Sequence, residues 1–295
     1  MNLWMTNAVA SQLNDPWASS FQPESEAIFA EMVPAPDPAR KALIDAAIVS
    51  MKAGGVLAKL DCLHWYPADS ELSSQLNWAN PSGPAGSLVN DAFWNADSSV
   101  CGASTPGSGI LTAFTPSAGV KFRHRHAEIG YYLHTAPAVP YGSSSHRPLL
   151  GATDTNYVAF STLPDHEALP GAWCLAYRKA DNRLRIRMAT DMSVESPNNV
   201  ANDVGMHSFV NPNVSGSEGL RAWEQGDTAH YLDVSLTGAT FGRPAVPVAL
   251  AAVNMGNGLW FQSDARFRMF YAGADLTIAE RNVLVSALET FVAAL

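Results

Sequence analysis

Aromatic residues beside amide or carboxylate side chains form the strongest chemical pattern in this sequence of 295 residues. An exposed aromatic ring can stack on the apolar face of a sugar, while neighbouring Asn and Asp groups hydrogen-bond its hydroxyls. Each ring has the alternative of a core position or a subunit contact. The candidate glycan-binding residues are Tyr141, Trp223, Asp227, Asn254 and Trp260.

Paired carboxylates would be needed for glycoside hydrolysis, and the sequence offers little support for them. Glucanases built on a β-sandwich place carboxylates at E-x-D-x-x-E spacing, because alternate residues of a strand point into the same cleft. No Glu is followed two residues later by Asp, and Glu128 has Gly130 at that position. The serine-hydrolase elbow and the phosphate-binding loop are also missing. We therefore expect no enzyme activity, with a depolymerase using Glu224 and Asp227 as the weaker alternative.

Metal and cofactor sites receive equally weak support. His124 and His126 share one face of a predicted strand, and an acidic, Asn-rich loop at residues 191–203 has the oxygen ligands that calcium prefers. A polar strand edge and a solvated turn explain these two features as well. Three widely spaced cysteines fall outside any zinc spacing, which favours buried thiols in a protein made in the cytoplasm. We expect no metal and no cofactor.

The overall composition restricts the partners. Hydrophobic residues make up 47% of the chain, charged residues make up 15%, and the formal net charge is -9. Nucleic-acid binding is disfavoured because phosphates require a clustered basic surface. We expect no membrane insertion, because no apolar run approaches the roughly 20 residues of a spanning helix. No secretion signal is expected at residues 1–14. The scarcity of charge also suits a surface that packs on partner subunits.

Three helices are predicted around these candidate residues. Residues 24–32 form a short one, stopped by Pro34. Residues 38–53 form a second, with Asp37 as its cap and Gly54 just past its end. The third follows Thr277, which has Glu280 in the position of a capping box. Residues 1–23 show no helical or strand period, and we interpret them as an arm that packs on another surface.

Between residues 110 and 274 the pattern changes to short strands separated by turn residues. At residues 183–188, apolar and Arg side chains alternate, which indicates a strand with one buried face. Frequent turns without intervening helices favour an all-β fold, a β-sandwich of the jelly-roll type with N-terminal helices and a C-terminal amphipathic helix. We therefore divide the chain into an arm at 1–23, a helical and loop segment at 24–109, and a sandwich at 110–295. The predicted strands are 128–135, 157–162, 183–190, 231–235, 246–254 and 266–272.

Several stretches resemble a family of tailed-phage and prophage virion structural proteins that carry a concanavalin A-like lectin/glucanase domain. The matching stretches are residues 40–45, 52–61, 76–78, 89–90, 128–135 and 271–277, where the last leads into the closing helix. Their order spans most of the chain after residue 24. The resemblance implies a concanavalin-like sandwich and a virion context, with no catalytic motif and no defined ligand site.

This resemblance implies a non-enzymatic component of a bacteriophage tail tip, fibre or capsid surface, assembled in the host cytoplasm. Its partners would be other virion proteins and further copies of itself, with a trimer as the natural arrangement for a fibre. A second hypothesis is a lectin that attaches the particle to host-surface polysaccharide. The two hypotheses are compatible and differ in whether a sugar site exists.

Overall fold

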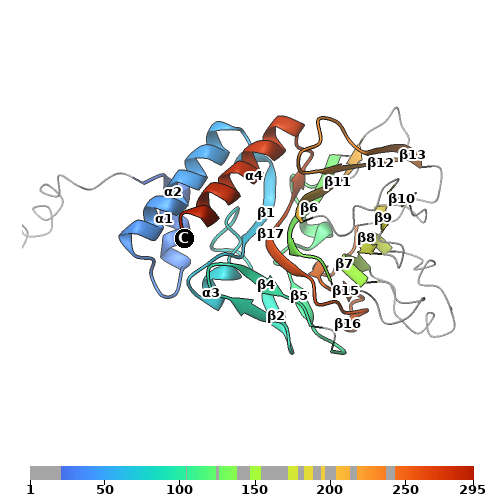
Figure 1. Cartoon of the computed structure of the whole chain (residues 1–295), viewed down its shortest axis with the longest axis horizontal. Coiled ribbons are helices and arrows are strands. Elements are labelled where there is room, and N and C mark those ends of the chain that lie inside the picture. The colour runs from blue at the N-terminus through green and yellow to red at the C-terminus, as the bar shows by residue number, and fades with distance from the viewer. Residues whose placement is uncertain are drawn as a thin grey trace, which may run out of the picture.

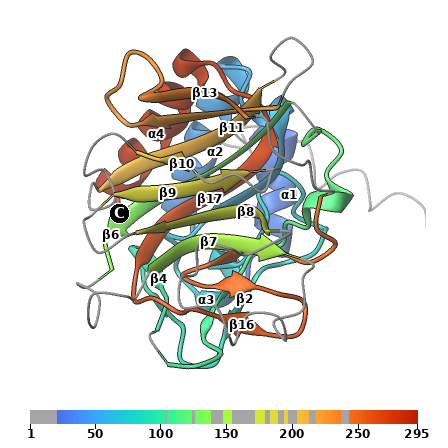
Figure 2. The same ribbon diagram turned by 90° about the vertical axis from the view of Figure 1, so that its right-hand side faces the viewer.

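Two β-sheets, antiparallel except for the pairing of β15 with β7, pack face to face and form the body of the molecule, and three helices cover the outside of one sheet (Figure 1). Figure 2 looks onto the other sheet, with the helices behind it. The computed structural model describes residues 21–103, 105–123, 126–137, 147–153, 172–178, 183–188, 194–196, 204–212, 218–236 and 243–295.

The sheet under the helices, here the inner sheet, has eight strands in the part of the chain that the structure describes. Strand β17 lies between β6 on one side and both β1 and β4 on the other, so segments from both halves of the chain share one ladder. In the order of the sheet the strands are β13 (Leu232–Leu236), β12 (Glu218–Glu224), β11 (Gly205–Pro212), β6 (His126–Thr135), β17 (Arg266–Ala274), β4 (Ser99–Cys101) and β3 (Phe93–Asn95), with β1 (Leu60–Trp65) beside β17.

The outer sheet has nine strands among the described residues. A short hairpin made by the last two strands named here lies beside the main path and extends from β7. In order, the strands are β10 (Val194–Glu195), β9 (Leu184–Met188), β8 (Ala172–Arg178), β7 (Arg147–Thr153), β14 (Ala249–Leu250), β5 (Gly109–Leu111) and β2 (Ser87–Val89), with β15 (Val253–Asn254) and β16 (Leu259–Trp260) in the hairpin.

Two of the long helices begin where a side chain binds free backbone N–H groups. The Asp37 carboxylate accepts a hydrogen bond from Arg40 N at 2.8 Å, and Thr277 and Glu280 form a reciprocal capping box. The helices are α1 (Pro23–Glu31), α2 (Pro38–Ala53), a single turn α3 (Glu71–Ser74) and α4 (Ile278–Ala293), with 3-10 turns η1 (Leu57–Lys59) and η2 (Pro116–Ala118). None of the helices in the described part of the chain combines the length and apolar character needed to cross a bilayer.

Two hydrophobic cores follow from the alternation of side chains along the inner sheet. On β6, Ile129, Tyr131 and Leu133 face the outer sheet, whereas Tyr132 packs among the helices. The helix-side core contains a stacked pair, Trp65 and Trp78, whose ring centroids lie 5.0 Å apart. Because both faces of the inner sheet are covered, most residues of its central strands β6, β11 and β17 are buried.

The predicted fold class, an all-β sandwich with flanking helices, is confirmed, and α2 has the predicted bounds. Predicted strands appear as β6, β9, β13 and β17, whereas the one at 157–162 lies outside the described residues. The prediction of one continuous strand at 246–254 is wrong. Ala251 adopts a φ of 57° and separates β14 from β15. The boundary at residue 109 is also wrong, since β1 to β4 already belong to the two sheets.

Candidate ligand-binding site

The β15–β16 hairpin brings two of the predicted residues, Asn254 and Trp260, to one pocket. Val253 pairs with Trp260 and Asn254 pairs with Leu259 across the hairpin. Gly256, with a φ of 77°, occupies a backbone conformation that side chains disfavour. Asn254 Oδ1 accepts a hydrogen bond from Gly256 N at 3.0 Å, which fixes the turn. The sequence N-M-G-N-G therefore positions the indole that follows it.

A hollow of about 710 Å³ lies between this hairpin and the turns that flank β2 and β5. Its size is that of an ordinary small-molecule site. Among the described residues, the lining consists of apolar, glycine and amide groups only. They are Val89, Asn90, Pro106, Gly107, Leu111, Asn254, Gly256, Gly258, Leu259, Trp260 and Gln262.

Hydrogen bonds to the backbone hold the pocket's three amide side chains in place. Asn90 Nδ2 donates to Gly107 O at 2.9 Å, and Asn254 Nδ2 donates to Pro247 O at 2.9 Å. The third, Gln262 Nε2, donates to Leu259 O at 2.7 Å. Because backbone carbonyls accept these bonds, each amide has a fixed orientation. The polar groups are thus arranged before any ligand arrives.

The indole of Trp260 is partly exposed at the rim of the pocket. Its Nε1 lies 3.3 Å from Asn257 Oδ1, the amide in the turn of the same hairpin. A ring held in this way loses little freedom when a ligand stacks on it, which favours binding. Among the described lining residues, Trp260 is the aromatic group with which a sugar ring can make contact.

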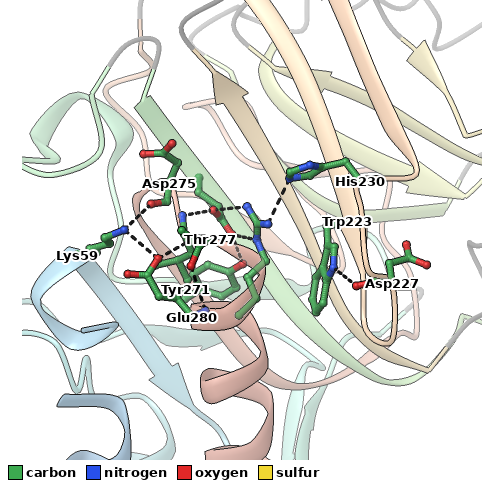
Figure 3. Close-up of polar contacts among 11 residues, drawn as sticks. Lys59, Trp223, Asp227, His230, Tyr271, Asp275, Thr277 and Glu280 are labelled. Carbon is green, nitrogen blue, oxygen red and sulfur yellow. Dashed lines mark hydrogen bonds and ion pairs between the residues drawn. The ribbon is translucent and has the colours of Figure 1, made fainter. Parts of the chain in front are cut away.

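The prediction that Trp223 stacks on a sugar is wrong, because the ring has no exposed surface. Its Nε1 donates to Asp227 O at 2.9 Å, and the guanidinium of Arg281 lies 5.8 Å from the ring centroid (Figure 3). Asp227 therefore supports Trp223 through its backbone. Both residues lie away from the pocket, and Tyr141 lies outside the described residues.

A buried ion pair near Trp223 joins β6 to the first turn of α4. Arg281 Nε and one terminal nitrogen each lie 2.8 Å from a Glu128 oxygen. Tyr271 Oη and Leu276 N donate to the same carboxylate, each at 2.6 Å. Burial, with the Glu128 carboxylate beside it, raises the pKa of Tyr271, so its hydroxyl stays protonated and donates. Four donors occupy the lone pairs of Glu128, which suits a structural role.

Other predicted candidates receive no support from a described cluster. His124 and most of the loop at 191–203 lie outside the described residues. Within the described ranges, no group of three or more His, Cys, Asp or Glu side chains is arranged to hold a metal ion. The backbone of Asp227 donates to Glu224 O at 3.1 Å, so these two residues share a turn after β12.

Sequence reasoning missed Asn90 and Gln262. Asn90 adopts a φ of 52° in the turn after β2, more than 160 positions before Trp260. The pairing of β2 with β5 brings this turn to the pocket. The one local signal is the choice of Asn, which tolerates a positive φ better than most residues.

Two packed sheets with flanking helices make this protein an all-β sandwich, and its described residues form a pocket with one indole and three fixed amides. No protein-family model matches the sequence, and no curated protein matches it. Among solved structures, one concerning cell entry of botulinum neurotoxin type C matches with a TM-score of 0.54 at 8% identity, over 80% of this chain and 53% of that chain.

Two further structures match over different shares of their length. A Trypanosoma rangeli sialidase mutant has 10% identity and a TM-score of 0.49, and the match covers 85% of this chain and 39% of that chain. The CBM40 of Ruminococcus gnavus IT-sialidase has 11% identity and a TM-score of 0.40, over 63% of this chain and 96% of that chain. The chain thus spans about two fifths of the sialidase and half of the toxin chain. Identities this low make the likeness one of fold alone.

Proposed function

We propose that this chain is a non-enzymatic lectin that binds a glycan in the pocket at Trp260. The observation that carries the proposal is the indole held at the rim of a hollow that three oriented amides line. Aromatic stacking on the C–H face of a sugar, together with hydrogen bonds to its hydroxyls, is the interaction these groups offer. The ligand would be a host-surface polysaccharide.

The lectin-like fold adds support to this proposal. Cell entry of botulinum neurotoxin type C depends on interaction with two ganglioside molecules, according to the structure that this chain resembles in fold. Unrelated functions share folds, so the argument for this chain rests on its own pocket. Glycan binding by the toxin makes a carbohydrate the first class of ligand to test.

The absence of enzyme activity is part of the proposal. Most retaining and inverting glycosidases use two carboxyl groups on either side of the bond that breaks. No Asp or Glu is among the described residues that line the Trp260 pocket. Glu128, on the central strand β6, is buried and bonded to Arg281, Tyr271 and Leu276. These observations favour binding over hydrolysis.

We further propose that the lectin is a structural component of a bacteriophage virion, at the tail tip, fibre or capsid surface, where it contacts other virion proteins. The support is the sequence resemblance. The matching stretches at 40–45, 52–61 and 271–277 fold into parts of α2, η1, the start of β1, the end of β17 and the cap of α4. These elements pack on one another, since α2 contacts α4 and β1 pairs with β17.

Glycan binding by purified protein tests the lectin proposal. On an array of bacterial and host glycans, we expect wild-type protein to bind at least one glycan, and Trp260→Ala to lose at least tenfold in affinity. The matched control is Phe93→Ala, because Phe93 is an exposed aromatic residue on β3 that does not line the pocket. Equal binding by wild type and Trp260→Ala would contradict the proposed site.

Assays for release of reducing ends from the bound polysaccharide test the non-enzymatic part. Unchanged polysaccharide after long incubation is the expected result. Release by wild-type protein that disappears in a Glu224→Gln, Asp227→Asn double variant would overturn this part of the proposal and establish a depolymerase.

A further inference from the structure

The amides of the Trp260 pocket differ from a random polar surface in the direction of their hydrogen bonds. Asn90, Asn254 and Gln262 each donate from the side-chain nitrogen to a backbone carbonyl. Asn90 lines the pocket and is bound through Nδ2, so its Oδ1 retains the capacity to accept a hydrogen bond. An acceptor pairs with the O–H of a sugar hydroxyl and repels an ionised carboxylate, which has only acceptor atoms.

The rest of the described lining is uncharged. Val89, Leu111 and Leu259 supply an apolar surface next to Trp260, and the described lining residues include no Lys, Arg or His. The chain as a whole carries a formal charge of -9. An ionised group moved from water onto such a surface loses hydration without gaining an opposite charge. A neutral sugar, by contrast, meets an apolar surface and the acceptor capacity of Asn90.

We propose that the Trp260 pocket selects an uncharged sugar residue, a hexose or N-acetylhexosamine unit, over a sialic acid or uronic acid unit. This inference rests on the proposed function and specifies its class of ligand. Stacking on Trp260 supplies the affinity, and the acceptor of Asn90 together with the neutral surroundings supplies the selectivity.

A glycan array that presents each neutral oligosaccharide beside its sialylated or uronate-containing counterpart provides the first test. We expect binding to neutral members to be at least tenfold tighter than to their acidic partners. Affinity should change less than twofold between 50 mM and 500 mM NaCl, since no charge pair forms. Tighter binding of acidic glycans through Trp260, weakened by salt, would overturn the inference and leave the lectin proposal standing.

Nuclear magnetic resonance of the indole N–H signals gives a direct readout. The signal of Trp260 is identified by its loss in Trp260→Phe, which keeps an aromatic ring. We expect this signal to shift during titration with the neutral oligosaccharide that the array selects, and not with its sialylated form. Binding of glycans without any shift at Trp260 would contradict the proposed site itself, so failure of the site and failure of the selectivity are distinguishable.

A charge placed in the pocket tests selectivity from the opposite direction. In Gln262→Lys, the new ammonium retains a donor for Leu259 O and adds a cation to the lining. We expect the ratio of neutral to sialylated affinity to fall at least tenfold, with a salt dependence that wild type lacks. Gln262→Met, of similar length and without charge, is the matched control and should keep the preference for neutral ligands. An unchanged ratio in Gln262→Lys would contradict the electrostatic basis of the inference.

Discussion

Glu128 and Arg281 are an ion pair that has almost no contact with water, since their side chains are 0% and 1% exposed. Removing two charges from water is costly, and their attraction together with the bonds from Tyr271 and Leu276 offsets that cost. The pair joins β6 to α4, and its two residues lie 153 positions apart in the sequence. Its value is therefore greatest as a contact that fixes where the closing helix lies.

Removal of one partner should be far more harmful than removal of both. Arg281→Met leaves Glu128 buried without its cation, and we expect a loss of about 3–5 kcal/mol in the free energy of unfolding. Urea unfolding followed by Trp fluorescence measures this loss. A Glu128→Leu, Arg281→Met double variant should recover part of it. A loss under about 1 kcal/mol in Arg281→Met would show that the pair is not a structural contact.

At the scale of elements, His64 connects three segments. It lies on β1 and is fully buried. Its Nε2 accepts a hydrogen bond from Ala113 N at 2.8 Å, which makes Nδ1 the donor to Leu76 O at 3.1 Å. One neutral imidazole thus ties the inner sheet to the loop after α3 and to the chain after β5. Burial outweighs the hydrogen bonds and lowers the pKa of His64 to about 4.

The free energy of unfolding should therefore decrease as the pH is lowered through a defined range. The unfolded chain binds a proton at His64 near pH 6.5, whereas the folded protein binds it only near pH 4. Lowering the pH from 6.5 to 4 therefore favours unfolding, by a contribution on the order of 3 kcal/mol. Urea midpoints of wild type and His64→Gln, measured at pH 7, 5.5 and 4, isolate this contribution from other histidines. The stability difference between them should shrink as the pH falls, and a constant difference would contradict the prediction.

Some elements could be predicted from sequence because their signals are local. Asp37 and Gly54 mark the two ends of α2, and Thr277 with Glu280 marks the start of α4. The strands β2 to β5 have three residues each, too few for a visible alternation. Their place in the sheets depends on partners far along the chain, such as the pairing of β4 with β17. No local pattern contains that information.

The same distinction applies to the candidate site. Asn254 and Trp260 could be predicted because one hairpin holds both of them. Trp223 also has acidic neighbours in the sequence, yet it is buried. It packs in the core under α4, a helix that begins 55 positions later. Burial of an aromatic ring is decided by such tertiary contacts, so sequence alone cannot separate a core indole from a ligand-binding one.

At the scale of the whole molecule, residues 1–20 carry Trp4 and Trp17, two large apolar side chains outside the described structure. We predict that the full chain forms a homo-oligomer and that a chain beginning at Phe21 is a monomer. This variant keeps the edge-on contact of Phe21 with Phe29, at a centroid distance of 5.2 Å, and the bond from Gln22 N to Asp45. Light scattering should give a multiple of 31.5 kDa for the full chain. A monomeric full chain at tens of micromolar would contradict this prediction.

The position of β17 has a consequence for biosynthesis. This strand occupies residues 266–274 and yet lies in the interior of the inner sheet, between β6 and the strands β1 and β4. During translation, β1 and β6 leave the ribosome long before β17, the strand that pairs with both of them, has been made. Until then, their hydrogen-bonding edges and the apolar faces of α1 and α2 are open to other chains. The inner sheet can therefore be completed only after residues 266–274 have been made, and chaperones that bind exposed strands should act before that point.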